Sequence, residues 1–127
     1  MEIFQIIKRN DVKSGKNEKI TIVGGGLSGP VMAMYLSEKG YRVDIYERRP
    51  DMRKTNISAG RSINLAVSKR GITALEEIGV FHKISSKLIP MYGRIIHDID
   101  GSTRFMPYGR PDQYINSVSR SELNILL

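Results

Sequence analysis

Hydrophobic and polar positions change their spacing several times along the 127-residue chain, and each change predicts a different element. Residues 20–23 form a short β-branched run that three glycines close, which is typical of a buried parallel strand entering a turn. Residues 27–39 are mostly good helix formers, and Gly40 follows where a left-handed helix stop is usual. Residues 42–47 predict a second strand. Because parallel strands need a crossover connection, these segments together predict a βαβ unit.

The later part of the chain shows a different pattern. Ser68 precedes a helix whose apolar residues repeat at helical spacing, and Gly79 marks its end. Residues 94–99 and 102–108 flank an Asp-Gly dipeptide, which favours the positive backbone angles of a tight turn. We therefore expect an antiparallel hairpin. Residues 114–118 predict one more strand.

The two ends of the chain are expected to be less regular. Residues 1–18 mix basic with small polar residues and show little sustained periodicity, so we expect a mobile basic leader. At the other end, Ser119 and Glu122 form a capping box for a helix that begins near Arg120. That helix reaches barely two turns and has no evident partner for its apolar face. We therefore expect the chain to be a fragment of a longer domain.

Several classes of site are excluded or disfavoured by composition. The chain has no cysteine, so disulfides, thiolate catalysis and cysteine-based metal sites are unavailable. His82 and His97 lie far apart and lack neighbouring ligands, so no metal site is expected. No apolar run approaches the roughly 20 residues that span a bilayer, and no membrane span is expected.

The net charge of +7 is concentrated in residues 42–70, which hold eight basic and three acidic residues. A nucleic-acid surface would also produce such an excess. The segment, however, lacks the interleaved aromatic residues and the recognition motif that such surfaces usually carry. We therefore expect no nucleic-acid partner, and interpret the charge as attraction for an anionic cofactor together with ordinary solvated surface.

The glycines after the first strand predict a dinucleotide site. Gly24-x-Gly26-x-x-Gly29 directly follows a strand and opens a helix, which is the context that gives this common pattern meaning. The first glycine permits the turn, the second lets a pyrophosphate approach, and the third lets helix and strand pack closely. Free amides at the helix start then face the phosphates. Glu47, at the tip of the second strand, would accept hydrogen bonds from ribose hydroxyls; the alternative is a structural turn beside a surface glutamate.

Three further motifs follow in order, and they are more specific than the glycines. They are ERRPD at residues 47–51, GRSINLA at residues 60–66 and PYG at residues 107–109. Together with the glycine turn, they resemble the kynurenine 3-monooxygenase family, a group of aromatic flavin hydroxylases. The resemblance extends over residues 20–127. It implies an α/β fold, namely a Rossmann-like FAD-binding βαβ unit with an added antiparallel hairpin, and it makes residues 19–127 the N-terminal part of a truncated FAD-binding domain.

The resemblance also implies which residues contact each ligand. Besides the glycines, it implies cofactor contacts from residues at the helix start, on the strands and on arginines. The expected cofactor-binding residues are Gly24, Gly26, Leu27, Ser28, Gly29, Glu47, Arg48, Arg49, Ala66 and Arg120. Arg94 and Tyr108 would hold the substrate carboxylate, a task that suits the planar fork of arginine. A two-residue hairpin loop would turn Arg94 and Tyr108 to opposite faces, whereas a three-residue loop or a bulge would bring them to one face. We predict the latter.

The chemistry that the resemblance implies is hydroxylation of L-kynurenine to 3-hydroxykynurenine, with FAD as bound cofactor and NADPH and oxygen as co-substrates. This step belongs to tryptophan degradation and NAD biosynthesis. No catalytic side chain is expected here, because the cofactor carries the reactive atom. A full-length eukaryotic member would lie at the mitochondrial outer membrane, and other members in the cytoplasm.

Two alternatives stay open. Another NAD(P)- or FAD-binding oxidoreductase would share the turn but would leave residues 60–66 and Arg120 unexplained. A non-catalytic remnant would keep the binding shape without turnover, and the piece alone is expected to be inactive.

Overall fold

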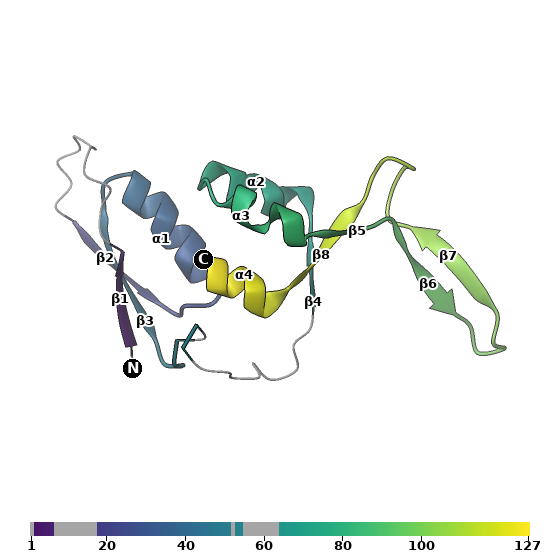
Figure 1. The fold of residues 1–127 in the computed structure, drawn as a ribbon, viewed down its shortest axis with the longest axis horizontal. Coiled ribbons are helices and arrows are strands. Elements are labelled where there is room, and N and C mark those ends of the chain that lie inside the picture. Colours follow the sequence, from purple (N-terminus) through teal and green to yellow (C-terminus); the bar gives the residue numbers. More distant parts are fainter. Residues whose placement is uncertain (1, 7–17, 52, 55–63) are drawn as a thin grey trace.

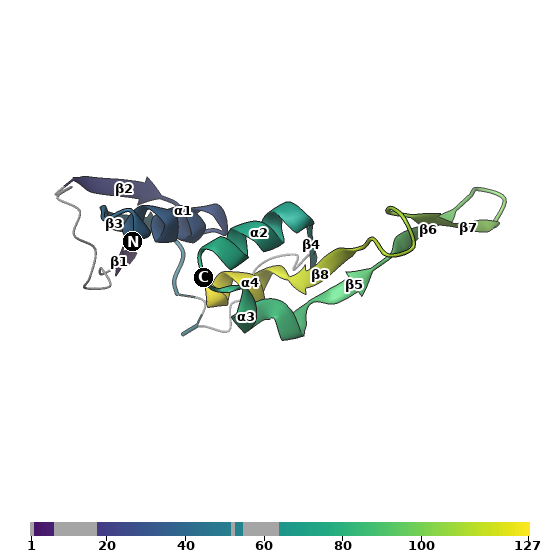
Figure 2. The ribbon, with the colours of Figure 1, turned by 90° about the horizontal axis from the view of Figure 1, so that it is seen from above.

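The computed structural model describes residues 2–6, 18–51, 53–54 and 64–127. These residues form an elongated molecule in three parts (Figures 1 and 2). A small sheet carrying one helix lies at one end, a second small sheet with three short helices lies in the middle, and a hairpin projects at the other end. The described helices include none that is long and apolar enough to cross a membrane.

The predicted βαβ unit is confirmed. Strand β2 (Lys19–Val23) leads into helix α1 (Ser28–Glu38), which returns the chain to strand β3 (Arg42–Glu47). The two strands run parallel, with Ile20 opposite Val43. Helix α1 lies along one face of this sheet (Figure 1). Its contact with the sheet buries Ala33, Val43 and Ile45.

Helix α1 ends as the sequence predicts. Gly40 has a φ of 87°, a backbone conformation that glycine adopts without strain. Its amide donates to the Ser37 carbonyl at 3.0 Å, and the Tyr41 amide donates to the Leu36 carbonyl at 3.1 Å. This pair of bonds satisfies carbonyls that a helix end otherwise leaves unpaired, so the chain can turn directly into β3.

The prediction of a mobile leader is wrong for residues 2–6. They form strand β1 (Glu2–Ile6), which pairs antiparallel with β3 and makes the sheet order β1-β3-β2. This pairing satisfies the edge of β3 that β2 leaves open. Five residues followed by a polar segment are too few to show a strand period in the sequence. Residues 7–17 of the expected leader lie outside the described residues.

The middle part is an antiparallel sheet with three short helices. Its strands, in the order β4-β8-β5, are β4 (Asn64–Val67), β8 (Ile115–Ser119) and β5 (Ile89–Met91). Its helical elements are α2 (Lys69–Glu77), α3 (Phe81–Ile84), the 3₁₀ turn η1 (Ser85–Lys87) and α4 (Arg120–Leu126). The sequence predicted β8, α2 and α4; β4, β5 and α3 are additions that the structure supplies.

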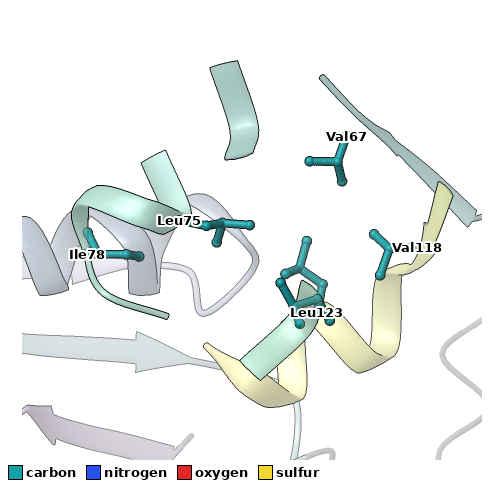
Figure 3. Packing of buried hydrophobic residues seen from close by; sticks show 6 residues of the cluster. Val67, Leu75, Ile78, Val118 and Leu123 are labelled. Atoms are coloured by element: carbon teal, nitrogen blue, oxygen red, sulfur yellow. The ribbon is translucent and has the colours of Figure 1, made fainter. Parts of the chain in front are cut away.

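The larger hydrophobic core lies between these strands and helices (Figure 3). It consists of Val67, Leu75, Ile78, Ile84, Val118 and Leu123. Leu123 of α4 is only 6% exposed, so the expectation that the last helix lacks a partner for its apolar face is wrong. Its partners lie far away in sequence, where no local pattern reveals them. Val31 and Met34 of α1 pack against the same core and connect it to the βαβ unit.

The predicted N-terminal caps of the helices are confirmed in part. The Ser119 hydroxyl accepts a hydrogen bond from the Glu122 amide at 3.4 Å, as a capping residue should. The Glu122 carboxylate does not complete the box; it forms an ion pair with Lys87 at 2.6 Å. Ser68 lies at the start of α2 as predicted, but its side chain makes no capping hydrogen bond within the described residues.

The projecting hairpin consists of β6 (Gly93–His97) and β7 (Thr103–Pro107). The Asp98 amide donates to the Ser102 carbonyl at 3.0 Å, so the loop itself has only three residues. Gly101, the last of them, has a φ of 85°. The prediction of a three-residue loop is therefore confirmed.

Candidate functional site

The glycine turn joins β2 to α1 and needs glycine at two positions for structural reasons. Gly24 has a φ of 111°, and its amide donates to the Tyr46 carbonyl at 2.8 Å. A Cβ at Gly29 would lie 2.0 Å from the Gly24 carbonyl oxygen, far inside van der Waals contact. The start of α1 therefore sits directly against the turn, as the sequence pattern predicts.

Gly26 differs from the other two glycines of the motif. A Cβ built there would meet no atom of the described residues within 4 Å, and its backbone does not adopt a positive φ. Neither backbone conformation nor packing in the described residues requires glycine at this position. An open backbone position in the middle of the turn is what a closely approaching ligand would require.

The amides at the start of α1 have no protein partner among the described residues. Helix α1 has Leu27 at its N-cap, and no side chain caps it. The amides of Leu27, Ser28 and Gly29 therefore remain available, together with the partial positive charge of the helix end. Pro30 occupies the third helical position, where an N–H would be unpaired in any case.

The expectation of free amides needs one correction. The amides of Gly24 and Gly25 are both used by β3, through the Tyr46 carbonyl and the Glu47 carboxylate. They tie the turn to the neighbouring strand because parallel strands end at the same edge. Only the amides from Gly26 onward are available to an anion.

Glu47 lies at the tip of β3, where the sequence places it. Its Oε2 accepts the Gly25 amide at 2.8 Å and Arg49 Nη2 at 2.9 Å. Its Oε1 accepts the Arg49 amide at 2.8 Å and Arg49 Nε at 3.1 Å. These bonds, the Arg49 side chain first, lower the pKa of Glu47 to about 2, so the carboxylate is ionised at neutral pH.

The carboxylate of Glu47 is therefore fully occupied by protein donors. A carboxylate has about four acceptor directions, and Gly25 and Arg49 fill them. Ribose hydroxyls could be accepted only after the Arg49 guanidinium moves. That side chain is 53% exposed, whereas the Glu47 side chain is 12% exposed, so the arginine is the partner that can turn away.

The lowered pKa of Glu47 predicts a pH-dependent contribution to stability. Because the folded pKa lies below the ordinary 4.5, the ionised carboxylate stabilises the fold above that pH and loses this effect as pH falls toward 2. Urea unfolding of Glu47→Gln should show a lower free energy of unfolding than the parent at pH 7. The difference should shrink between about pH 4.5 and 2. A difference that stays constant over this range would contradict the assignment.

A residue that the sequence did not reveal completes the turn. The Asn124 side chain of α4 donates from Nδ2 to the Gly25 carbonyl at 3.1 Å and to the Gly26 carbonyl at 3.3 Å. Asparagine inside a helix is mildly unfavourable, which is the only local hint that it has another task. Nothing local connects it to glycines 98 and 99 positions earlier.

The remaining predicted cofactor residues lie outside the glycine turn. Arg48 follows Glu47 and is exposed. Ala66 lies on β4 opposite Ser117 of β8, the strand that leads into α4. Arg120 is the first residue of α4, one helical turn before Asn124, and is exposed. Their contacts with a cofactor stay predictions.

Arg94 and Tyr108 share one face of the hairpin. The register places Arg94 opposite Met106, and the Tyr108 amide donates to the Tyr92 carbonyl at 2.9 Å, which continues the same pairing. Alternation then puts both side chains on one face. Arg94 Nη2 also donates to Met106 Sδ at 3.2 Å. The hairpin stands away from the glycine turn, at the far end of β5 and β8 (Figure 2). The described residues do not bring the two predicted sites together.

Comparisons with known proteins agree with this geometry. A family model described as NAD(P)-binding Rossmann-like domain matches residues 22–62, which include the turn and β3. The structure of p-nitrophenol 4-monooxygenase PnpA from Pseudomonas putida DLL-E4 is similar, with a TM-score of 0.61 over 86% of this chain and 27% of that chain. At 19% identity, this similarity concerns the fold alone. The predicted α/β, Rossmann-like fold is confirmed.

Sequence relatives are more specific. The chain is 47% identical over 109 residues to kynurenine 3-monooxygenase of Legionella pneumophila (strain Corby), covering 85% of this chain and 24% of that protein. It is 49% identical over 112 residues to the Cytophaga hutchinsonii enzyme of the same name, covering 87% and 25%. For the Sus scrofa enzyme the identity is 47% over 105 residues, covering 83% and 22%. The predicted resemblance is confirmed, and the chain spans about a quarter of the length of these relatives.

Proposed function

We propose that this chain, which is similar to the N-terminal part of kynurenine 3-monooxygenases, provides the FAD-binding βαβ unit of an NADPH-using monooxygenase that hydroxylates L-kynurenine. The observation that carries the proposal is the glycine turn. It has an open position at Gly26, uncapped amides beyond it, and the ionised Glu47 carboxylate at the neighbouring strand tip. These groups fit a pyrophosphate and a ribose in that order along the site.

The protein's own part in this function is binding and orientation. When bound, FAD supplies the redox chemistry that activates oxygen for transfer to an aromatic ring. The amides of Gly26, Leu27 and Ser28 would hold the diphosphate, assisted by the positive end of α1. Glu47 would accept from the ribose once the Arg49 guanidinium turns away, and that guanidinium would then be free to meet phosphate charge. Arg48, Ala66 and Arg120 would add contacts around the cofactor.

We further propose that Arg94 and Tyr108 bind the substrate carboxylate. Both lie on one face of the hairpin, and arginine offers a planar pair of donors for a carboxylate. Both residues are exposed in the described part of the chain, Tyr108 to 44%, so they are accessible to a small molecule. The hairpin would then act as the substrate-binding arm.

The direct test is a flavin and turnover assay on the protein expressed from its complete gene. We expect flavin to be released when the purified protein is denatured, and NADPH oxidation to rise when L-kynurenine is added. Absence of flavin, even after incubation with FAD, would contradict the proposal. Bound flavin with no response to L-kynurenine would retain the cofactor assignment and reject the substrate.

The match to an NAD(P)-binding family model favours a second candidate, in which the same turn binds a nicotinamide dinucleotide. Competition separates the two. Under our proposal, FAD binds more tightly than NADPH and is not displaced by it. Displacement of FAD by an equal concentration of NADPH would favour the second candidate.

Replacement of Arg94 tests the substrate arm. Arg94→Gln should raise the KM for L-kynurenine about tenfold or more, because it removes a charge-assisted pair of hydrogen bonds. FAD content should be unchanged, since β6, the strand that carries Arg94, stands away from β2 and α1 (Figure 2). Arg104→Gln is the matched control, because Arg104 is also an exposed arginine of the hairpin but contacts Asp98 near the loop. Equal KM values for the two variants would contradict the assignment.

A further inference from the structure

We infer that Asn124 is a positioning residue for the dinucleotide, and that it acts by holding the carbonyls of the glycine turn toward α4. This inference deepens the proposed function and rests on it. Among the described residues, Asn124 is the only side chain from outside the βαβ unit that is hydrogen-bonded to the turn. Its two bonds go to the consecutive carbonyls of Gly25 and Gly26, at 3.1 and 3.3 Å.

Peptide geometry explains how such a contact would act. In a trans peptide, the C=O of one residue and the N–H of the next point in opposite directions. When the Gly25 carbonyl is held toward α4, the Gly26 amide must point away from that helix. The Gly26 carbonyl fixes the Leu27 amide in the same way. These are two of the amides that have no protein partner among the described residues.

The chemistry of the side chain suits this task. A primary amide has two donor hydrogens and carries no charge, so it can engage two carbonyls without placing a competing charge beside a phosphate. An aspartate of the same shape would have only acceptors at neutral pH and would repel both carbonyls. Without these two hydrogen bonds, glycines 25 and 26 have wide conformational freedom, and their carbonyl dipoles could turn toward the anion.

Helix α4, which carries Asn124, is held in place by contacts of its own. Leu123, the adjacent residue, is buried in the larger core, while Ser119 caps the helix and Glu122 pairs with Lys87. Arg120 lies four residues before Asn124 and therefore on the same side of the helix. One short helix thus orders the phosphate-binding amides and carries the expected arginine contact.

The test compares Asn124→Ala and Asn124→Asp with the control Ile125→Ala. Ile125 is the next residue on α4 and is 43% exposed. Calorimetry should show FAD and ADP binding weakened about tenfold in the alanine variant, because two hydrogen bonds are lost. The aspartate variant should bind more weakly still, because its carboxylate repels the two carbonyls. Without ligand, both variants should still fold, with a thermal midpoint only a few degrees below that of the control, because two hydrogen bonds are lost while Leu123 keeps α4 in the larger core. ADP is included because it carries the diphosphate and ribose without the flavin.

A second readout does not depend on cofactor. Amide hydrogen exchange at Gly26 and Leu27, measured by NMR without ligand, should be altered in both Asn124 variants and unchanged in the control. Unchanged affinity in the aspartate variant, or a loss of thermal stability with normal affinity, would overturn the inference. If the parent protein itself binds no FAD, the proposed function fails. Unchanged exchange at Gly26 and Leu27 in the Asn124 variants would then also overturn the positioning role of Asn124.

Discussion

Gly29→Ala is expected to disrupt the glycine turn and abolish cofactor binding. The added Cβ would lie 2.0 Å from the Gly24 carbonyl oxygen and 3.2 Å from its carbonyl carbon. Both are backbone atoms, which cannot rotate away as a side-chain end would. Either α1 must shift along its axis or the turn must open, and we expect a loss of about 2–3 kcal/mol in the free energy of unfolding. FAD binding should fall below detection because the amides at the helix start move with α1.

Chemical denaturation and FAD titration of the variant measure these two effects. Gly71→Ala is a useful comparison, because among the described residues its Cβ would meet the Val67 side chain alone, at 3.0 Å, outside the βαβ unit. That variant should keep normal FAD affinity. A Gly29→Ala protein with parental stability would contradict the close approach that the structure shows.

Gly26→Ala is expected to separate binding from folding. Its Cβ would enter open space, and its backbone does not need a positive φ, so the free energy of unfolding should change by less than about 0.5 kcal/mol. The methyl group would nevertheless occupy the place where a pyrophosphate approaches the backbone. We expect FAD affinity to fall on the order of 100-fold, which corresponds to the loss of close contact with several amides.

The contrast between the two alanine variants is more informative than either alone. Gly29 is required by the protein, whereas Gly26 is required only by the ligand that we propose. Parental FAD affinity in Gly26→Ala would mean that the diphosphate does not approach this position. Strong destabilisation of the same variant would mean that the turn is packed differently from the structure.

Features that depend on neighbouring residues were predictable from the sequence. Gly24 and Gly40 adopt the positive φ values that their positions imply, and the Asp100-Gly101 dipeptide closes the hairpin. The common face of Arg94 and Tyr108 follows from the three-residue loop, because strand side chains alternate, but that loop length was predicted from the resemblance and not from the dipeptide. These signals are local, and the physics that produces them acts within a few residues.

Features that depend on distant contacts were not predictable. The capture of β1 by β3 and the burial of Leu123 both depend on partners from other parts of the chain. The contact of Asn124 with the glycine turn was missed for the same reason, since the two glycines lie about a hundred positions earlier. The occupation of Glu47 by Arg49 was missed for another reason. The sequence places both residues at the site but does not indicate that the arginine fills acceptor positions of the carboxylate.

The central claim is that the amides from Gly26 to Ser28 receive the diphosphate of FAD. The most direct measurement is an NMR titration of the isotope-labelled protein with FAD and with riboflavin, which lacks phosphate. The account predicts large chemical-shift changes at the amides of Gly26, Leu27 and Ser28 with FAD, and none there with riboflavin. FAD binding that leaves these three amides unshifted would contradict it.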